Sequence, residues 1–224
     1  MFKISAVLVL TACGLYAEQS LVLNGTNLGI GTFPTTGVFA APLTQYRIEF
    51  RFDGLALPQV SGNNNFCAGG CWTGVSSYWS SDSNSILYLG DSSTARVSIG
   101  LNGATSGIVR YQVLSSGTYE VEYWNLAGVK VVVPVTASGP IPALNLSGQP
   151  VSFGSSLSAV NIAWARFSTT TVPLGSPPPS LTYSGSSGVI GNLGDWEFEG
   201  NGVDQSSNGT TITGVGITSS TCSG

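Results

Sequence analysis

The stretch Tyr46-Arg47-Ile48-Glu49-Phe50-Arg51-Phe52-Asp53 shows the strictest alternation of apolar and charged side chains in the sequence. Successive side chains of a β-strand point to opposite faces, so this pattern predicts a strand with four apolar residues on one face. The other face carries Arg, Glu, Arg and Asp, and a slip of one residue would bury all four charges. We therefore expect a firmly set register, with the charged face turned to solvent or to a partner.

Similar short runs recur between Gly, Asn and Ser along the rest of the chain, whereas helical periodicity is hard to find. Further strands are predicted at residues 85–89, 96–101, 108–114, 117–124, 129–135 and 160–167. The links at residues 101–104, 114–117 and 125–128 suit tight antiparallel turns, because Asn and Gly tolerate a positive φ. This spacing predicts an all-β, antiparallel sandwich or barrel.

The composition excludes several kinds of chemistry. No histidine occurs in the 224 residues, and 8% of them are charged, against roughly 25% in an ordinary soluble domain. The chain therefore lacks a Ser-His-Asp triad, a Cys-His pair and any His-bearing zinc site. It also lacks nucleotide-binding glycine motifs and serine-acylation motifs. The 11 acidic residues outnumber the 7 basic ones, which form no run, so nucleic acid is not an expected partner.

The first 17 residues read as an export signal: Lys3, an apolar run over residues 4–10, and then small residues. Two cleavage readings stay open. Residues 10–13 resemble a lipobox that would leave Cys13 lipidated, whereas residues 15–17 fit an ordinary signal-peptidase site. We expect a secreted or cell-surface protein, with a lipid anchor under the first reading and no transmembrane segment after the signal.

The remaining cysteines are Cys67, Cys71 and Cys222. In an oxidising compartment we expect a disulfide between Cys67 and Cys71, because the two glycines between them permit a sharp turn. Cys222 then has no assigned partner. A zinc site is the competing interpretation, but it would need Cys222 and a fourth ligand in a chain without histidine.

A segment rich in Pro, Gly and Ser, residues 173–180, separates a main unit from a tail. The main unit covers residues 18–180 and the tail residues 181–224. Alternation returns at residues 195–209, which begin Asp195-Trp196-Glu197-Phe198. This tail is either a last strand of the same sheet or the opening strand of a second, truncated unit.

Three stretches together resemble a LamG-like jelly-roll domain of the concanavalin A-like lectin and glucanase superfamily. They are Ser20-Leu21-Val22-Leu23-Asn24-Gly25-Thr26-Asn27, Tyr46-Arg47-Ile48-Glu49-Phe50 and Ala159-Val160-Asn161-Ile162-Ala163-Trp164-Ala165-Arg166-Phe167. The resemblance implies a jelly-roll β-sandwich, and residues 195–209 are similar to the phrase that often opens such domains.

Glu120 and Glu122 are spaced to share one face of a strand, as a glycosidase carboxylate pair requires. Glucanases of the resembled fold carry a longer Glu-x-Asp-x-Glu run, whereas this chain has Trp124 at the third position. A solvated sheet face is therefore the favoured interpretation of the two glutamates, and catalysis the alternative.

The segment at residues 61–91 is the predicted binding loop, with Asn64, Trp72, Tyr78 and Trp79 as ligand contacts. Aromatic faces beside amides suit sugar rings, and long loops on a rigid sandwich often carry function. The alternative is that these aromatic residues only cover the end of the sandwich.

Many LamG-like domains bind calcium, and Asp82, Asn84 and Asp91 are the candidate ligands. No ligand spacing supports them, so solvated turn residues are the competing interpretation. No other cofactor is expected.

Together these features predict a non-catalytic extracellular recognition or adhesion module, with a glycan or a surface protein as partner. Two alternatives stay open: a polysaccharide-degrading enzyme of the same fold, and a structural spacer unit of a larger surface protein.

Overall fold

A computed structural model of the chain describes sixteen β-strands and the connections nearest to them. The described residues are 19–23, 29–53, 63–68, 77–81, 86–90, 96–101, 104–115, 118–132, 135–138, 143–153, 160–169, 171, 192–197, 210–211, 213–214 and 217–219. The predicted signal with Cys13, the segment at 173–180 and Cys222 lie outside them.

The strands form two eight-stranded sheets, and every described strand pairing is antiparallel. Sheet A runs in the order β10 (Lys130–Val131), β9 (Tyr119–Trp124), β8 (Gly107–Val113), β3 (Tyr46–Asp53), β13 (Val160–Ser168), β1 (Gln19–Leu23) and β16 (Ile217–Ser219), and β14 (Asn192–Glu197) also pairs with β13. Sheet B runs in the order β11 (Val135–Ser138), β7 (Arg96–Gly100), β6 (Ile86–Gly90), β5 (Ser77–Ser81), β4 (Asn63–Ala68), β12 (Pro150–Phe153), β2 (Gly29–Thr32) and β15 (Thr213–Gly214). The all-β prediction is confirmed.

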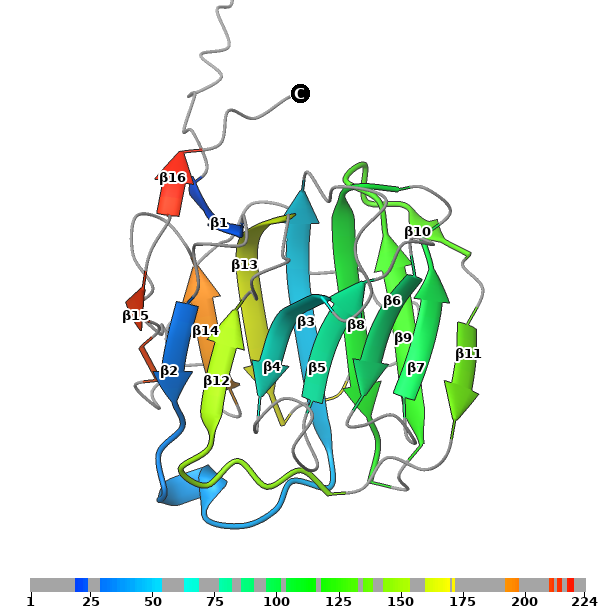
Figure 1. Cartoon of the computed structure of the whole chain (residues 1–224). Helices are drawn as coiled ribbons and strands as arrows, with labels where there is room; N and C mark the ends of the chain where they lie inside the picture. Colours follow the sequence, from blue (N-terminus) through cyan, green and yellow to red (C-terminus); the bar gives the residue numbers. More distant parts are fainter. Residues whose placement is uncertain are drawn as a thin grey trace, which may run out of the picture.

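Figure 1 shows the strands of sheet B lying in front of those of sheet A, so that the sheets form two layers. One cluster of buried side chains joins the layers: it takes Phe50 and Phe52 from sheet A and Ile99, Val151 and Phe153 from sheet B. All of these side chains are at most 1% exposed. The core therefore lies between the two sheets.

Strand β3 has the predicted bounds, and its apolar face is buried as predicted. Tyr46, Ile48, Phe50 and Phe52 are between 0 and 3% exposed. The turns after β8 and β9 are also as predicted. Asn125 closes the second of these, because its side-chain oxygen accepts hydrogen bonds from the backbone nitrogens of Ala127 and Val129.

Two sequence predictions about connections are wrong. At residues 101–104 the Ala104 nitrogen donates to the Leu101 carbonyl at 3.0 Å, as in the predicted tight turn. The strands on either side, β7 of sheet B and β8 of sheet A, belong to different sheets, so they make no hairpin. The strand predicted at 129–135 is divided into β10 and the start of β11, which belong to different sheets. Val132, between them, is 92% exposed and outside both sheets.

The tail strands pair with the main sheets: β14 with β13, β15 with β2 and β16 with β1. Trp196 of β14 is fully buried and belongs to the main core, where its ring meets Phe153 edge to face. In the described residues the tail thus takes the role of terminal strands of the same sheets. Within these residues, no helix has the length and apolar character needed to span a membrane.

Candidate functional site

The face of sheet A that points away from the core carries most of the charged side chains that the structure describes. Alternation along β3 puts Glu49 on this outer face, because its neighbours Ile48 and Phe50 are in the core. The strand register then aligns Glu49 with Arg110 of β8, and Arg110 with Glu122 of β9. A row of alternating charge therefore crosses three adjacent strands.

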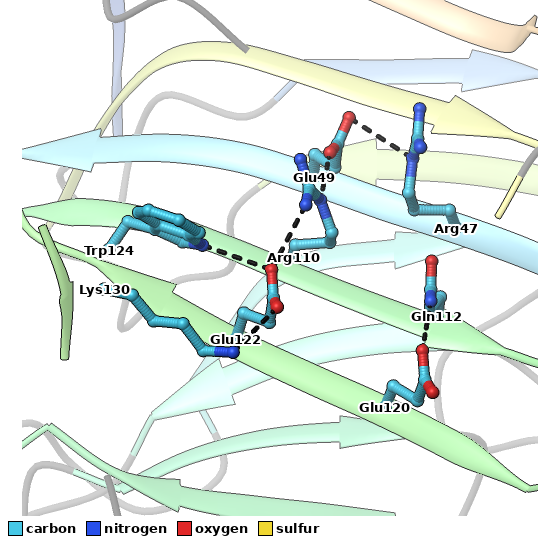
Figure 2. Close-up of polar contacts among 8 residues, drawn as sticks. All are labelled: Arg47, Glu49, Arg110, Gln112, Glu120, Glu122, Trp124 and Lys130. Atoms are coloured by element: carbon cyan, nitrogen blue, oxygen red, sulfur yellow. Dashed lines mark hydrogen bonds and ion pairs between the residues drawn. The ribbon is translucent and has the colours of Figure 1, made fainter. Parts of the chain in front are cut away.

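Figure 2 shows that Arg110 bridges the two glutamates of this row. Its Nε donates to Glu49 Oε1 at 2.6 Å and its Nη1 to Glu122 Oε2 at 3.1 Å. The same Glu122 oxygen accepts a hydrogen bond from Trp124 Nε1 at 3.2 Å, and Glu122 Oε1 accepts one from Lys130 Nζ at 2.9 Å. We call Glu49, Arg110, Glu122, Trp124 and Lys130 the charged cluster.

Glu49, Arg110 and Glu122 of the charged cluster are buried, which corrects two sequence predictions, whereas the Lys130 side chain is 40% exposed. Arg47, Arg51 and Asp53, on the same face of β3 as Glu49, are half-buried. The three buried residues have exposures of 1%, 4% and 2%, so Glu49 and Glu122 are not solvated. The cause is the register, because each buried carboxylate has a cation directly opposite it on the next strand. Opposite charges paired and hydrogen-bonded in this way can be removed from water, whereas a single charge cannot.

Arg47 lies at the margin of the charged cluster. Its Nε is 3.4 Å from Glu49 Oε2, a longer ion pair than that of Arg110 with the same carboxylate. Burial lowers the pKa of Arg47, the carboxylate of Glu49 opposes this shift, and the nearby Arg110 and Arg166 lower the pKa further. The face thus holds several guanidinium groups close together, and Glu49 is what offsets their repulsion.

Glu120 sits two residues before Glu122 and is half-buried. It pairs in register with Gln112, whose side-chain nitrogen donates a hydrogen bond to Glu120 Oε2. Both candidate catalytic carboxylates are therefore on the outer face of β9. Both oxygens of Glu122 accept hydrogen bonds, from Arg110 and Trp124 on one and from Lys130 on the other.

The sequence reasoning missed Arg110, Gln112 and Lys130 as partners of the two glutamates. One signal was present: Arg110 and Gln112 alternate with apolar residues in the stretch 108–113. When an Arg lies between apolar residues of a strand, an acidic residue opposite it on the next strand would stabilise the pair of strands. The identity of that partner depends on the strand order, which the sequence does not state.

The predicted binding loop at residues 61–91 contains three strands of sheet B, β4, β5 and β6, and is not one loop. Asn64 lies in β4, and Tyr78 and Trp79 are adjacent in β5. The loop prediction failed because β4 and β5 are rich in Asn and Ser. These residues are more common in loops than in strands, and they hide the alternation of apolar residues that predicts a strand. A register shift between Asn64 and Phe66 also interrupts the alternation.

The strand register divides the three candidates between the two faces of sheet B. Trp79 pairs with Phe66, and Phe66 pairs with the buried Phe153, so Trp79 is placed on the core side. Tyr78 is its neighbour along the strand and is placed on the outer side. Positions 78 and 79 therefore alternate between the two faces of β5.

Asn64 and Tyr78 do share the outer side of sheet B. Asn64 pairs with Ser80, Ser80 with Tyr88, and Tyr88 with Ser98. A second row places Tyr78 opposite Cys67 and Cys67 opposite Ser152. We call this set of positions the hydroxyl face: Asn64, Cys67, Tyr78, Ser80, Tyr88, Ser98 and Ser152.

Ser152 is the member of the hydroxyl face whose side chain is described, and it is half-buried. Ser152 pairs with Ile30, which is 52% exposed on the same side of the sheet. The seven residues of the hydroxyl face are uncharged, and the second row continues from Tyr78 through Gly90 to Arg96, which is a cation. They offer the amide, hydroxyl and aromatic groups that bind sugar hydroxyls and CH faces.

The other candidates, Trp72, Cys71, Asp82, Asn84 and Asp91, lie outside the described residues. Cys67 is in β4, and its pairing with Cys71 stays a prediction. In the part of the chain that the structure describes, no three His, Cys, Asp or Glu residues are grouped as metal ligands would be. A calcium site at Asp82, Asn84 and Asp91 likewise stays a prediction.

Comparison with models of protein families finds no match to this chain, and comparison with curated proteins finds none either.

Proposed function

We propose that this protein is a non-catalytic extracellular recognition or adhesion module that binds a polysaccharide on the hydroxyl face of sheet B. The observation that carries the proposal is the register of β4, β5 and β6, which aligns Asn64, Ser80 and Tyr88 in one row and puts Tyr78 beside them. A flat, uncharged row of this kind suits an extended sugar chain, because hydroxyl and amide groups can follow successive rings.

A LamG-like jelly roll is the fold that we propose for the two sheets. Support comes from two layers of eight antiparallel strands, and from chain crossings between layers such as the one at residues 101–104. Location outside the cytoplasm rests on the signal-like residues 1–17.

The state of Glu122 supports binding over hydrolysis. A glycosidase acid must present a protonated oxygen to the glycosidic bond, but each Glu122 oxygen accepts a hydrogen bond from Lys130, Arg110 or Trp124. Exposure is low as well, since Glu122 is 2% exposed. The charged cluster is therefore better suited to holding β3, β8 and β9 together than to cutting a polymer.

Retention on affinity gels tests the proposal. Gels containing β-glucan, xylan, mannan or alginate are run with calcium and then with a chelator. We expect retention on at least one neutral polymer, weakened about tenfold or more by Tyr78→Ala and less by Asn64→Ala, since a lost stacking contact costs about 1–3 kcal/mol.

Lys130→Ala, on the outer face of the other sheet, is the matched control and should retain the parent's affinity. Failure of the parent protein to bind any of these polymers, with or without calcium, would refute carbohydrate recognition. Polymer cleavage that is abolished by Glu122→Gln would favour the enzyme instead.

A further inference from the structure

The carboxylate of Glu49 lies among arginine residues on the outer face of sheet A. Arg110 and Arg166 are opposite it on β8 and β13, and Arg47 is two positions before it on β3. Arg110 has the closer contact, because its Nε donates to Glu49 Oε1 at 2.6 Å. Arg47 Nε is 3.4 Å from the other oxygen, and neither of these two atoms has a hydrogen-bond partner. Glu49 therefore pairs well with Arg110 and weakly with Arg47.

The Arg47 guanidinium keeps its terminal nitrogens within reach of solvent. The side chain is 11% exposed, and Nε alone among its nitrogens is both buried and without a hydrogen-bond partner. Figure 2 shows the guanidinium extending away from Gln112 and Glu120, so Glu120 does not compensate its charge. The terminal nitrogens carry most of the N–H donors of an arginine. Among the described residues, these donors have no acceptor.

The electrostatic surroundings of Arg47 favour a negatively charged ligand. Burial lowers the pKa of Arg47, the carboxylate of Glu49 opposes this shift, and the positive charges of Arg110 and Arg166 lower the pKa further. The whole chain has a formal net charge of −4, so this concentration of positive charge is local. An added negative charge beside Arg47 would stabilise its charged form.

We propose that Arg47 is the centre of an oxyanion-binding site on the outer face of sheet A, and that this site takes a carboxylate or sulfate group. A planar guanidinium presents parallel N–H donors that match two oxygens of such a group. The group belongs either to a free anion or to an acidic sugar of a polymer. The site is on the opposite sheet from the hydroxyl face, so it does not depend on the function proposed above.

Calorimetric titration of the full chain tests the site with sodium sulfate, sodium glucuronate and alginate, each at the same ionic strength. We expect saturable binding of a probe, weakened about tenfold or more by Arg47→Gln, because hydrogen bonds to a charged group are lost. Arg47→Lys keeps the charge but not the planar fork, so its affinity should fall about threefold or more. Thermal unfolding in chloride alone checks that each variant is folded.

Lys130→Ala is the matched control, because it removes a cation from the same face whose side chain is 40% exposed. It should bind the probes as the parent does. Binding of sulfate and glucuronate supports a site for a free anion, whereas Arg47-dependent binding of alginate alone identifies an acidic polymer. The site is refuted if the parent binds none of the three probes, or if Arg47→Gln binds them as tightly as the parent. Should Arg47→Gln fail to fold, parent-like affinity of Arg47→Lys overturns the proposal.

Discussion

The outer faces of the two sheets differ in the polar residues that they carry and in the contacts of these residues. On sheet A the polar groups of the charged cluster bind one another, and Glu49, Arg110 and Glu122 are almost fully buried. On sheet B the hydroxyl face carries uncharged residues, and Ile30 in the same row is 52% exposed. The difference points to separate roles: on sheet A the charged groups bind one another and stabilise the fold, whereas the uncharged positions of sheet B are the ones that we propose for polysaccharide binding.

The largest expected effect comes from removing the cation at the centre of sheet A. Arg110→Met leaves Glu49 and Glu122 buried without their shared partner, so the free energy of unfolding should fall by about 3–5 kcal/mol. Chemical denaturation at neutral pH measures this change. Lys130→Ala is the control, because the Lys130 side chain is 40% exposed and exposed pairs contribute less than about 1 kcal/mol. Equal effects of the two substitutions would contradict the special role of Arg110.

Substitution of two neighbouring residues of β5, Tyr78 and Trp79, tests which side of sheet B faces the core. Trp79→Ala should lower the free energy of unfolding by about 3 kcal/mol or more, because a large aromatic on the core side leaves a cavity. Tyr78→Ala, on the outer side, should cost less than about 1 kcal/mol while it weakens glycan binding. Thermal unfolding and gel retention of both variants are measured together, and the reverse order of the two stability losses would overturn the assigned faces.

A smaller effect is expected from Glu122→Gln. The amide keeps the shape of Glu122 but removes the charge that Arg110 and Lys130 bind, so unfolding should become easier by about 1–3 kcal/mol. Retention on the glycan gel should not change, because the charged cluster lies on the other sheet. A loss of glycan binding without a loss of stability would move the binding site to sheet A.

The smallest expected effect is that of salt. The seven residues of the hydroxyl face are uncharged, although Arg96 lies in the row of Tyr78. Retention on a neutral glycan gel should therefore be nearly the same at low ionic strength and at about 1 M salt, where charges more than about 3 Å apart are screened. The stability contributed by the charged cluster should also change little, because buried pairs are screened less than exposed ones. Elution from the gel by salt alone would show that charged residues outside the hydroxyl face carry the binding.

Strict alternation made β3 predictable to the residue, because four apolar and four charged positions admit one register. The burial of Glu49 was not predictable, since Arg110 neutralises it only once β8 is known to lie beside β3. Short loops posed the same problem: residues 101–104 are as compact as a hairpin turn, yet they cross between sheets.

The strands at the candidate site were missed for a local reason. The Asn and Ser residues of β4 and β5 resemble loop composition, and the register shift beside Asn64 breaks the period of two. The residue types at the site could therefore be selected from the sequence, but not their division between the two faces. That division depends on the strand register. The face on which Asn64 or Tyr78 lies is known only once its partner on the neighbouring strand is known.

The order of strands in sheet A has a consequence for how the chain folds. Its central strand β3 pairs with β13, and β1 at the start of the described chain pairs with both β13 and β16. Contacts so distant in sequence make folding slow, on the order of milliseconds to seconds. During synthesis, β3 can pair with β8 as soon as residues 107–113 have been made, whereas β1 has to wait for residues 160–168 before it acquires a partner in sheet A.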